Sequence, residues 1–223
     1  MDKINLQGGN VNIDSSFYAM TFSFIKKNAS VLNLGCGINF NFEKALKKEK
    51  NVNITSVDII PQVFKPDFVD RFILQSVENE FRLDKKFDVV AFFELIEHID
   101  KTDVLFKNCF NNLKDDGNLI FSFPNLSSIY ARVELLLGYQ PHILEVSNEY
   151  GNFGTGIFGK INNKPGGSIH HIRGITYKAM IGMVNYHGFK VIKKIGFDYR
   201  FGKLFYFFSS IAPINIFICK KNI

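Results

Sequence analysis

The stretch that decides the fold is VLNLGCGIN, residues 31–39. An apolar run ends in Gly35 and Gly37, with one residue between them. This pattern predicts a buried strand that runs into a tight loop, because glycine lets a backbone turn sharply and approach a ligand without a Cβ in the way. Taken alone, the pattern is equally compatible with a plain turn between a strand and a helix.

Strand-like runs alternate with helix-like runs along the rest of the chain. We expect strands at 30–35, 52–58, 71–77, 87–94, 118–125, 189–197 and 215–221, and helices at 14–27, 40–50, 100–117, 126–141 and 176–188. Asp14 and Ser15 are suitable N-cap residues for the first helix, and Gly117 is a suitable C-cap for the third. The alternation predicts an α/β fold with a mostly parallel sheet and helices on both faces.

We expect a single domain, because no linker, internal repeat or low-complexity tract divides the chain. It would comprise an N-terminal helical cover (1–29), a core (30–125), a substrate-side insertion (126–175) and a closing helix with strands (176–223). Residues 139–169 are rich in Gly and Asn, and a loop of this length inside a compact domain is usually functional.

Composition limits the class of protein. The three cysteines are far apart and form no CxxC pair, which fits a reducing cytoplasm and argues against a disulfide framework. The polar N-terminus lacks the apolar core of a signal peptide. From Lys160 onward the chain holds eleven Lys or Arg and one acid, which could attract an anionic substrate or form a solvated face. No nucleic-acid motif accompanies this charge.

The most apolar segment near the end of the chain is LFYFFSSIAPINIFI, residues 204–218. It is shorter than the roughly 20 residues that span a bilayer. We expect a helix followed by a buried strand, and no stable membrane insertion. If the segment formed an exposed apolar face instead, it would indicate contact with a membrane or a lipid-linked substrate.

Two further groups of residues carry chemistry. Asp58 ends the second expected strand, 23 residues after Gly35, where an acid can bind the hydroxyls of a ribose. FDVVAFFELIEHI, residues 87–99, places Glu94, Glu97 and His98 where the fourth strand ends. Ligands of open α/β sheets bind at this edge.

Together these motifs resemble the class I S-adenosylmethionine-dependent methyltransferases. VLNLGCG resembles their glycine motif, SVD the acid after the second strand, FDVVAFFELIEHI the fourth-strand motif, and LKDDGNLIFSFPN the fifth, in the same order. PNLSSIYARVELLLGYQPH and HIRGITYKAMIGMVNYHGFKVIKKIG resemble a bacterial branch that often acts in surface-polysaccharide and small-molecule pathways. The resemblance implies a Rossmann-like sheet of seven strands and S-adenosylmethionine as cofactor, with S-adenosylhomocysteine as product.

The resemblance also implies roles for individual residues. Gly35, Cys36 and Gly37 would pass beside the methionine part of the cofactor, and Asn33 stands where the family has an acid that orders it. The remaining cofactor contacts would come from Asp58 at the ribose, Ile59, Ser76 and Val77 at the adenine, Phe93, Glu94 and His98 along the floor, and Tyr18 as a cover.

Three departures from the family pattern predict weaker cofactor binding. Asn33 brings no charge, although its amide oxygen can accept a hydrogen bond. Asn39 occupies a position that is often a third glycine, and Asn tolerates left-handed backbone better than most residues. Ser76 replaces a common aspartate.

Methyl transfer to a hydroxyl needs a base with a pKa near neutrality, and histidine suits that role. We expect His171 to be this base, with His170 and His142 as second and third candidates. Arg173 and Tyr139 would contact the acceptor. No cluster has metal-ligand spacing, so the sequence predicts metal-independent transfer.

The predicted activity is O-methylation of a sugar, sugar nucleotide or similar polar metabolite by a monomer or homodimer. An isoprenoid or quinone acceptor and a non-catalytic S-adenosylmethionine-binding protein remain as alternatives. A nucleotide-dependent oxidoreductase is disfavoured, because Gly35 and Gly37 are followed by Phe40 rather than by the third glycine of GxGxxG.

Overall fold

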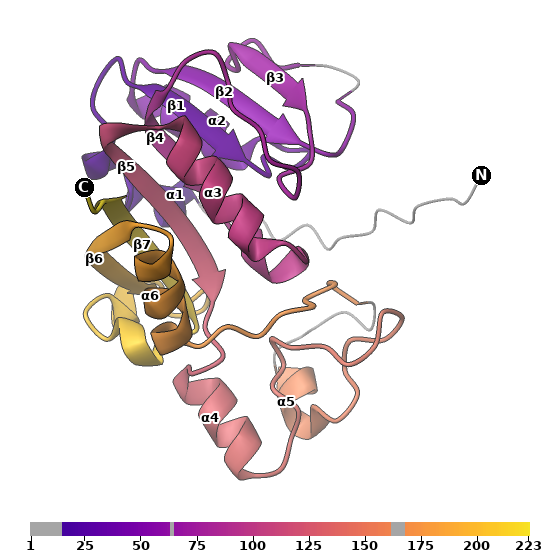
Figure 1. Cartoon of the computed structure of the whole chain (residues 1–223). Helices are drawn as coiled ribbons and strands as arrows, with labels where there is room; N and C mark the ends of the chain where they lie inside the picture. Colours follow the sequence, from indigo (N-terminus) through magenta and orange to yellow (C-terminus); the bar gives the residue numbers. More distant parts are fainter. Residues whose placement is uncertain (1–14, 63–64, 162–167) are drawn as a thin grey trace.

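The computed structural model describes residues 15–62, 65–161 and 168–223 (Figure 1). Its seven-stranded sheet has the order β3-β2-β1-β4-β5-β7-β6. All neighbouring strands are parallel except β7, which is antiparallel to β5 and β6. The strands are β1 (Ser30–Leu34), β2 (Asn53–Asp58), β3 (Arg71–Leu74), β4 (Phe87–Phe92), β5 (Leu113–Pro124), β6 (Phe189–Phe197) and β7 (Ile214–Lys221).

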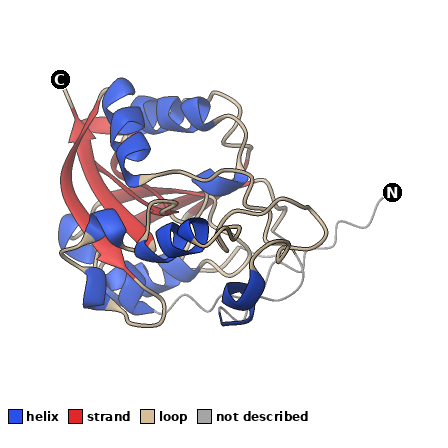
Figure 2. Ribbon diagram, turned by 90° about the horizontal axis from the view of Figure 1, so that it is seen from below, coloured by secondary structure: helices blue, strands red, loops and turns tan. Residues whose placement is uncertain are grey.

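Helices cover both faces of the sheet (Figure 2). The α-helices are α1 (Ser15–Ala19), α2 (Asn41–Glu49), α3 (Thr102–Asn112), α4 (Ile129–Leu136), α5 (Gly156–Ile161) and α6 (Tyr177–Tyr186). The short 3₁₀ helices are η1 (Phe22–Phe24), η2 (Ile96–His98), η3 (Lys203–Phe205) and η4 (Ser209–Ile211). The predicted α/β class, with a mostly parallel sheet, is therefore confirmed.

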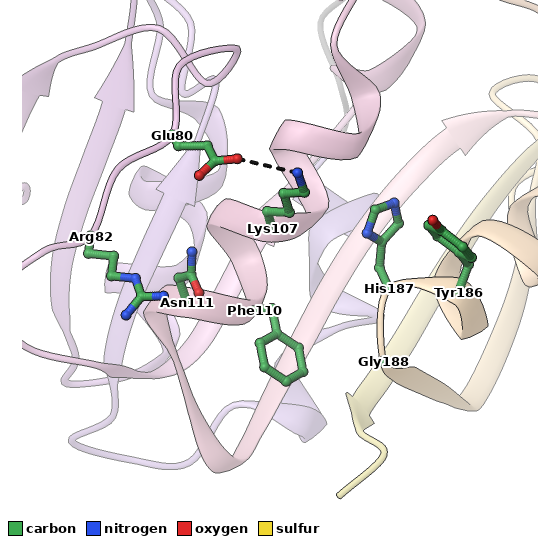
Figure 3. A pocket seen from close by; sticks show the side chains of 8 residues that line it. All are labelled: Glu80, Arg82, Lys107, Phe110, Asn111, Tyr186, His187 and Gly188. Carbon is green, nitrogen blue, oxygen red and sulfur yellow. Dashed lines mark hydrogen bonds and ion pairs between the residues drawn. The ribbon is translucent and has the colours of Figure 1, made fainter.

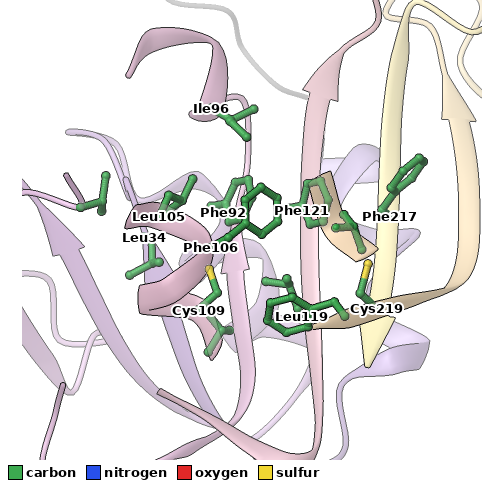
Figure 4. Close-up of a cluster of buried hydrophobic side chains, with 14 of the residues drawn as sticks. Leu34, Phe92, Ile96, Leu105, Phe106, Cys109, Leu119, Phe121, Phe217 and Cys219 are labelled. Atoms are coloured by element: carbon green, nitrogen blue, oxygen red, sulfur yellow. The ribbon is translucent and has the colours of Figure 1, made fainter. Parts of the chain in front are cut away.

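The two larger of the three apolar clusters in the described residues lie one on each face of the sheet. Leu32 and Leu34 of β1 face the cluster that includes α3 and α6, while Val31 faces the cluster that includes α1 and α2. Because both faces are covered, the strands read as continuous apolar runs rather than alternating ones. On the face of the sheet that α3 covers, aromatic rings from β4, β5, β7 and α3 meet, and Cys109 and Cys219 lie among them (Figure 4).

Helices α4 and α5, which lie between β5 and α6 in the chain, are placed beyond the end of the sheet where β5 finishes (Figure 1). Helix α4 begins where the Ser128 hydroxyl accepts a hydrogen bond from the Ala131 amide, at 3.2 Å. The short helix α5 lies within the segment predicted as a long loop. No helix in the described ranges is both long enough and apolar enough to cross a bilayer.

The structure corrects three predicted element boundaries. Helix α3 ends at Asn112 rather than at Gly117, and Gly117 lies inside β5. A Cβ on Gly117 would lie 2.6 Å from Leu113 Cδ1, so this glycine serves close packing and not a helix end. The first helix is shorter than 14–27, although the predicted cap Asp14 lies outside the described residues. Residues 204–211 form η3 and η4 turns rather than one helix.

Phe121 is expected to be a main contributor to stability. It is fully buried, and its ring stacks on Phe92 with centroids 4.7 Å apart. Phe121→Ala should lower the free energy of unfolding by about 3–5 kcal/mol, because it removes a buried ring and leaves a cavity. Urea denaturation followed by circular dichroism measures this loss.

Phe207→Ala is the matched control, since this phenylalanine is 84% exposed. We expect a change within about 0.5 kcal/mol. Equal effects of the two substitutions would contradict the assignment of Phe121 to the core.

Candidate active site

The turn after β1 has the geometry that its glycines predict. Gly35 and Gly37 adopt φ values of 69° and 64°, in the left-handed region that side chains disfavour. The Gly35 amide donates to the Val57 carbonyl at 2.8 Å, which joins the turn to β2. A Cβ on Gly35 would lie 2.7 Å from Leu95, whereas one on Gly37 would meet nothing within 4 Å. The Gly37 backbone therefore borders open space.

Asp58 connects this turn to the end of β2. Its Oδ2 accepts a hydrogen bond from the Gly37 amide at 2.8 Å, and its Oδ1 accepts one from the Ile60 amide at 2.9 Å. A carboxylate held by two backbone amides has a fixed position, and each oxygen keeps a further lone pair. This arrangement fits the recognition of two neighbouring hydroxyls on a ribose.

Apolar side chains at the same edge of the sheet are exposed. Ile38 is 57% exposed, Ile59 is 67% exposed, and Leu74 at the end of β3 is 57% exposed. The Ser76 hydroxyl accepts a hydrogen bond from the Glu78 amide at 3.2 Å, while the Val77 side chain is buried in the core. Ile59 and its neighbours thus offer an apolar surface that a planar base could cover.

Asn33 has a carboxyl partner that the sequence did not indicate. Its amide donates to Glu43 Oε1 at 2.8 Å, and the Ser56 hydroxyl donates to the same oxygen at 2.7 Å. Glu43 lies on α2 and is completely buried. A carboxyl group therefore faces Asn33 from the helix, and weaker cofactor binding stays a prediction.

Glu43 is held in an environment that disfavours its charge. Desolvation raises the pKa of the Glu43 carboxyl, and the hydrogen bonds from Asn33 and Ser56 only partly oppose this rise. Asn33 Oδ1 and Glu43 Oε2 are both buried without a hydrogen-bond partner among the described residues. Both are acceptors, so a proton on Glu43 would supply the donor that this pair lacks.

The left-handed residue after the glycine turn is Phe40, not Asn39. Phe40 has a φ of 48°, and Asn39 does not have a positive φ. Such a conformation is strained for a bulky residue and persists only when the surroundings impose it. Phe40 is 2% exposed and packs edge-on against Phe68 and Phe72, which provides this constraint. The predicted left-handed role of Asn39 is therefore incorrect.

Strand β4 ends at a second group of polar residues. Glu94 has a φ of 47°, and Ser122 of β5 contacts it twice, accepting from its amide at 3.0 Å and donating to its Oε1 at 2.7 Å. Desolvation raises the pKa of Glu94 to about 7, against the opposing hydrogen bond from Ser122. Desolvation also raises the pKa of Glu97, and the nearby Glu94 carboxyl raises it further.

His98 and His171 both direct Nε2 toward Glu97. The two Nε2 atoms lie 3.8 and 3.9 Å from Glu97 Oε1, and the rings are edge-on with centroids 4.8 Å apart. Desolvation is the main cause that lowers the pKa of His98. These groups come from η2 and from a segment more than seventy residues later, so only the fold brings them together.

Arg173 helps to hold that later segment in place. Its Nε donates to the Ile99 carbonyl at 2.8 Å, and a terminal nitrogen donates to the Asp100 carbonyl. The Ile172 amide donates to the Glu97 carbonyl at 2.9 Å. The guanidinium predicted to bind an acceptor therefore binds the loop after η2.

The other residues predicted to act on or contact the methyl acceptor lie in the insertion, and each has a partner within the protein. His142 Nδ1 lies 2.7 Å from Oε1 of the buried Glu134. His170 has a φ of 58° and contributes its carbonyl to His98 Nδ1 at 3.1 Å. Tyr139 packs on Phe158, with ring centroids 5.5 Å apart. Of the three histidine candidates, only His171 places its ring beside Glu97.

Aromatic side chains enclose the site from the side of α1. Tyr18 is 4% exposed, and its ring contacts Phe93 edge-on with centroids 5.1 Å apart. Desolvation raises the pKa of Tyr18, and Glu43 and Glu94 raise it further. Desolvation also raises the pKa of Tyr199, with Glu94 as the next cause. Tyr199, which follows β6, was not apparent from the sequence because no motif surrounds it.

A separate hollow of about 450 Å³ is lined by residues of α3, by the segment before β4 and by the end of α6 just before β6 begins. Figure 3 shows Glu80 and Lys107 paired across one side of it, with their charged atoms 3.3 Å apart. His187 Nε2 lies 2.8 Å from Asp103 Oδ1. Lys107 and His187 thus have acidic partners within the protein, and the hollow shares no residue with the site described above.

Comparisons with known proteins agree with this geometry. The family model described as a methyltransferase domain matches residues 16–193. The chain is similar to N-methyltransferase 4 of Papaver somniferum, with 29% identity over 107 residues, or 44% of this chain and 30% of that protein. It is also similar to malonyl-[acyl-carrier protein] O-methyltransferase 1 of Ilyobacter polytropus, with 31% identity over 104 residues, or 44% and 38% of the two chains.

Both alignments span well under half the length of these curated relatives. A solved structure of an S-adenosylmethionine-dependent methyltransferase from Methanosarcina mazei shares the fold, with a TM-score of 0.61 and 13% identity over 91% of this chain and 96% of that one. At this identity the likeness shows the fold alone.

The pairing of Asn33 with Glu43 predicts the effect of restoring an acid on β1. Asn33→Asp should lower the free energy of unfolding by about 3 kcal/mol or more, because it places a second buried carboxyl against Glu43 and removes the donor. Adding Glu43→Gln should recover most of this loss, since the reversed pair again has one amide and one carboxyl. Denaturant unfolding at pH 8 measures both effects.

Glu43→Gln alone should remove the pH dependence of stability that Glu43 contributes. A folded pKa above the ordinary value makes wild-type stability fall as pH rises above about 4.5, so the variant should gain relative to wild type between pH 5 and pH 8. Asn53→Asp, at an exposed position on β2, is the control. A double variant no more stable than Asn33→Asp would contradict the pairing.

Proposed function

The chain belongs to the methyltransferase domain family, and from this premise we propose that it transfers a methyl group from S-adenosylmethionine to a hydroxyl of a small polar acceptor. S-adenosylhomocysteine is the second product. The match covers most of the chain and includes every strand from β1 to β5, so it contains the whole edge at which the cofactor would bind.

The observation that carries this proposal is the position of Asp58. Its carboxylate is fixed by the Gly37 and Ile60 amides, beside exposed Ile38 and Ile59. A nucleoside with two ribose hydroxyls and an apolar base matches both features. The methionine part would then pass Gly35, Cys36 and Gly37, toward Glu94 and the Tyr18 side of the site.

The transfer itself is an in-line displacement on an already activated sulfonium. Its rate depends mainly on placing the acceptor oxygen near attack distance. His171 is our candidate for removing the acceptor proton, with Glu97 orienting its ring. The hydroxyl proton passes to His171, the oxygen forms the new bond to the methyl carbon, and the carbon–sulfur bond electrons remain on sulfur.

A sugar or sugar nucleotide is the acceptor class that we favour. The insertion predicted at 126–175 would cover the acceptor, and the basic residues from Lys160 onward suit an anionic metabolite. The O-methyltransferase and N-methyltransferase among the relatives act on different atoms, so the preference for oxygen rests on the histidine beside the acceptor position.

A lipid-linked acceptor, such as an isoprenoid or quinone, is a second candidate with its own observation. Leu204, Phe207 and Phe208 are 65%, 84% and 63% exposed. These three residues follow Tyr199 along the chain, and Arg200 and Lys203 lie between Tyr199 and Leu204. Exposed aromatic and basic residues on one segment fit the anionic surface of a membrane, from which such an acceptor would be taken.

Cofactor binding tests the role of Asp58. Asp58→Asn should weaken binding of S-adenosylmethionine and S-adenosylhomocysteine by roughly 10- to 100-fold, because hydrogen bonds to a charged group contribute about 1.5–3 kcal/mol each. Isothermal titration calorimetry measures this. Asp70→Asn is the control, since Asp70 also accepts a backbone amide hydrogen bond, from Ile54 at 2.7 Å, at the opposite end of β2.

Incubation of the protein with cell extract and cofactor labelled in the methyl group tests the activity. We expect label in a small-molecule fraction, and His171→Gln should lower this transfer by at least about 100-fold while cofactor affinity is retained. Tight cofactor binding with no labelled acceptor under any condition would identify a non-catalytic binder and refute the proposed activity.

Vesicle binding separates the two acceptor classes. If the acceptor is lipid-linked, the protein should cosediment with vesicles that contain anionic phospholipid, and replacing Phe207 and Phe208 by Ser should lower the bound fraction several-fold. Tyr186→Ser is the control, because Tyr186 is equally exposed, at 84%, at the end of α6. Absence of vesicle binding by the wild type would leave the polar acceptor as the proposal.

A further inference from the structure

Glu97, His98 and His171 form a cluster that the proposed function has used only in part. Each offers one ligand atom, and these atoms all lie within 4.8 Å of one another. We propose that the three side chains bind one divalent transition-metal ion at the acceptor side of the site. This inference rests on the proposed function for its role in catalysis, but the binding of the ion can be tested without it.

The distances suit a single ion. The Nε2 atoms of His98 and His171 lie 3.8 and 3.9 Å from Glu97 Oε1. Two ligand atoms that share an ion with bonds of about 2.0–2.2 Å lie roughly 3.0–3.5 Å apart. Side-chain rotation would complete the site if it brought these two separations in by a few tenths of an ångström and also brought the two imidazole nitrogens, which lie within 4.8 Å of each other, into the same range.

Both imidazole rings are oriented as metal ligands are. His98 Nδ1 lies 3.1 Å from the His170 carbonyl, and His171 Nδ1 lies 2.8 Å from the Ile143 carbonyl. Since a carbonyl oxygen only accepts, each Nδ1 carries a proton, and in the neutral imidazole the lone pair is then on Nε2. Hydrogen bonds of this kind fix the tautomer and orientation of metal-binding histidines.

The buried carboxyl group of Glu97 is the group that requires a partner. It is 1% exposed, and neither of its carboxylate oxygens has a hydrogen-bond partner among the described residues. Within the same ranges, no ion pair joins a Lys or Arg to Glu97 or Glu94. Leaving a buried carboxylate without compensation costs several kcal/mol, and a divalent cation would remove that cost.

The ligand types indicate the class of ion. Two imidazole nitrogens and one carboxylate suit Zn²⁺ or Mn²⁺ better than Mg²⁺, which prefers oxygen ligands. Three protein ligands leave coordination positions open, as in catalytic sites. An acceptor hydroxyl bound there would lose its proton more readily, and the proton would pass to solvent water. With the ion bound, His171 would serve as a ligand in place of the base role proposed for it above. This proposal replaces the prediction of metal-independent transfer.

Titration of chelator-treated protein tests the site directly. Calorimetry with Zn²⁺ and, separately, Mn²⁺ should show one ion per chain with micromolar or tighter affinity for at least one of them. Co²⁺ should give the visible absorption bands of a site with nitrogen and oxygen ligands. Glu97→Gln and His171→Gln should each weaken binding by about 100-fold, and S-adenosylhomocysteine titration should show that both variants remain folded.

His142→Gln is the matched control, because His142 also lies beside a buried glutamate but outside the cluster. Its metal affinity should equal that of wild type. Absence of stoichiometric binding by wild type, or binding that survives both cluster substitutions, would overturn the metal site. Methyl transfer that persists unchanged in excess chelator would overturn the catalytic role of the ion and leave the proposed function intact. Stoichiometric binding of the ion without methyl transfer would support the metal site and count against the proposed function.

Discussion

The parallel pairing of β1 with β2 and β4 is the constraint on which the site depends. Leu34 is in register with Val57 on one side and Phe92 on the other. The residues that follow these three positions therefore leave the sheet at one edge, which brings Gly35, Asp58 and the polar residues after β4 together. A shift of one residue would turn these side chains to the opposite face and disrupt both core clusters.

A second contact determines how the acceptor side is assembled. The Glu97 carbonyl accepts amide hydrogen bonds from Ile172 and Arg173, and Arg173 in turn binds the carbonyls after η2. This backbone pairing brings the segment of His171 next to Glu97, and the contact of His171 Nδ1 with the Ile143 carbonyl orients the ring. Arg173 is thus a positioning residue in this structure, and its charge is used within the protein rather than on a ligand.

The parts of the site that follow from local rules could be predicted from the sequence. The glycine turn, Asp58 and the end of β4 each lie within or directly after one strand. Other features depend on contacts between distant segments. Nothing near Asn33 indicates that Glu43 will face it, because a glutamate among lysines on an amphipathic helix is usually solvated. The helix end at Asn112 depends on the pairing of Leu113 with Phe87, which local sequence around Gly117 does not show.

The two buried glutamates show how the same physical problem can have different solutions. Glu43 has two donors on one oxygen, a raised pKa, and a second oxygen that would be satisfied by its own proton. It can therefore be neutral and structural. The Glu97 side chain has no hydrogen-bond donor among the described residues, and the Nε2 atoms of His98 and His171 lie 3.8 and 3.9 Å from its Oε1. Two lone pairs and a carboxylate repel one another unless a proton or a cation lies between them. A single proton can satisfy only one pair, whereas an ion at the centre satisfies all three groups at once.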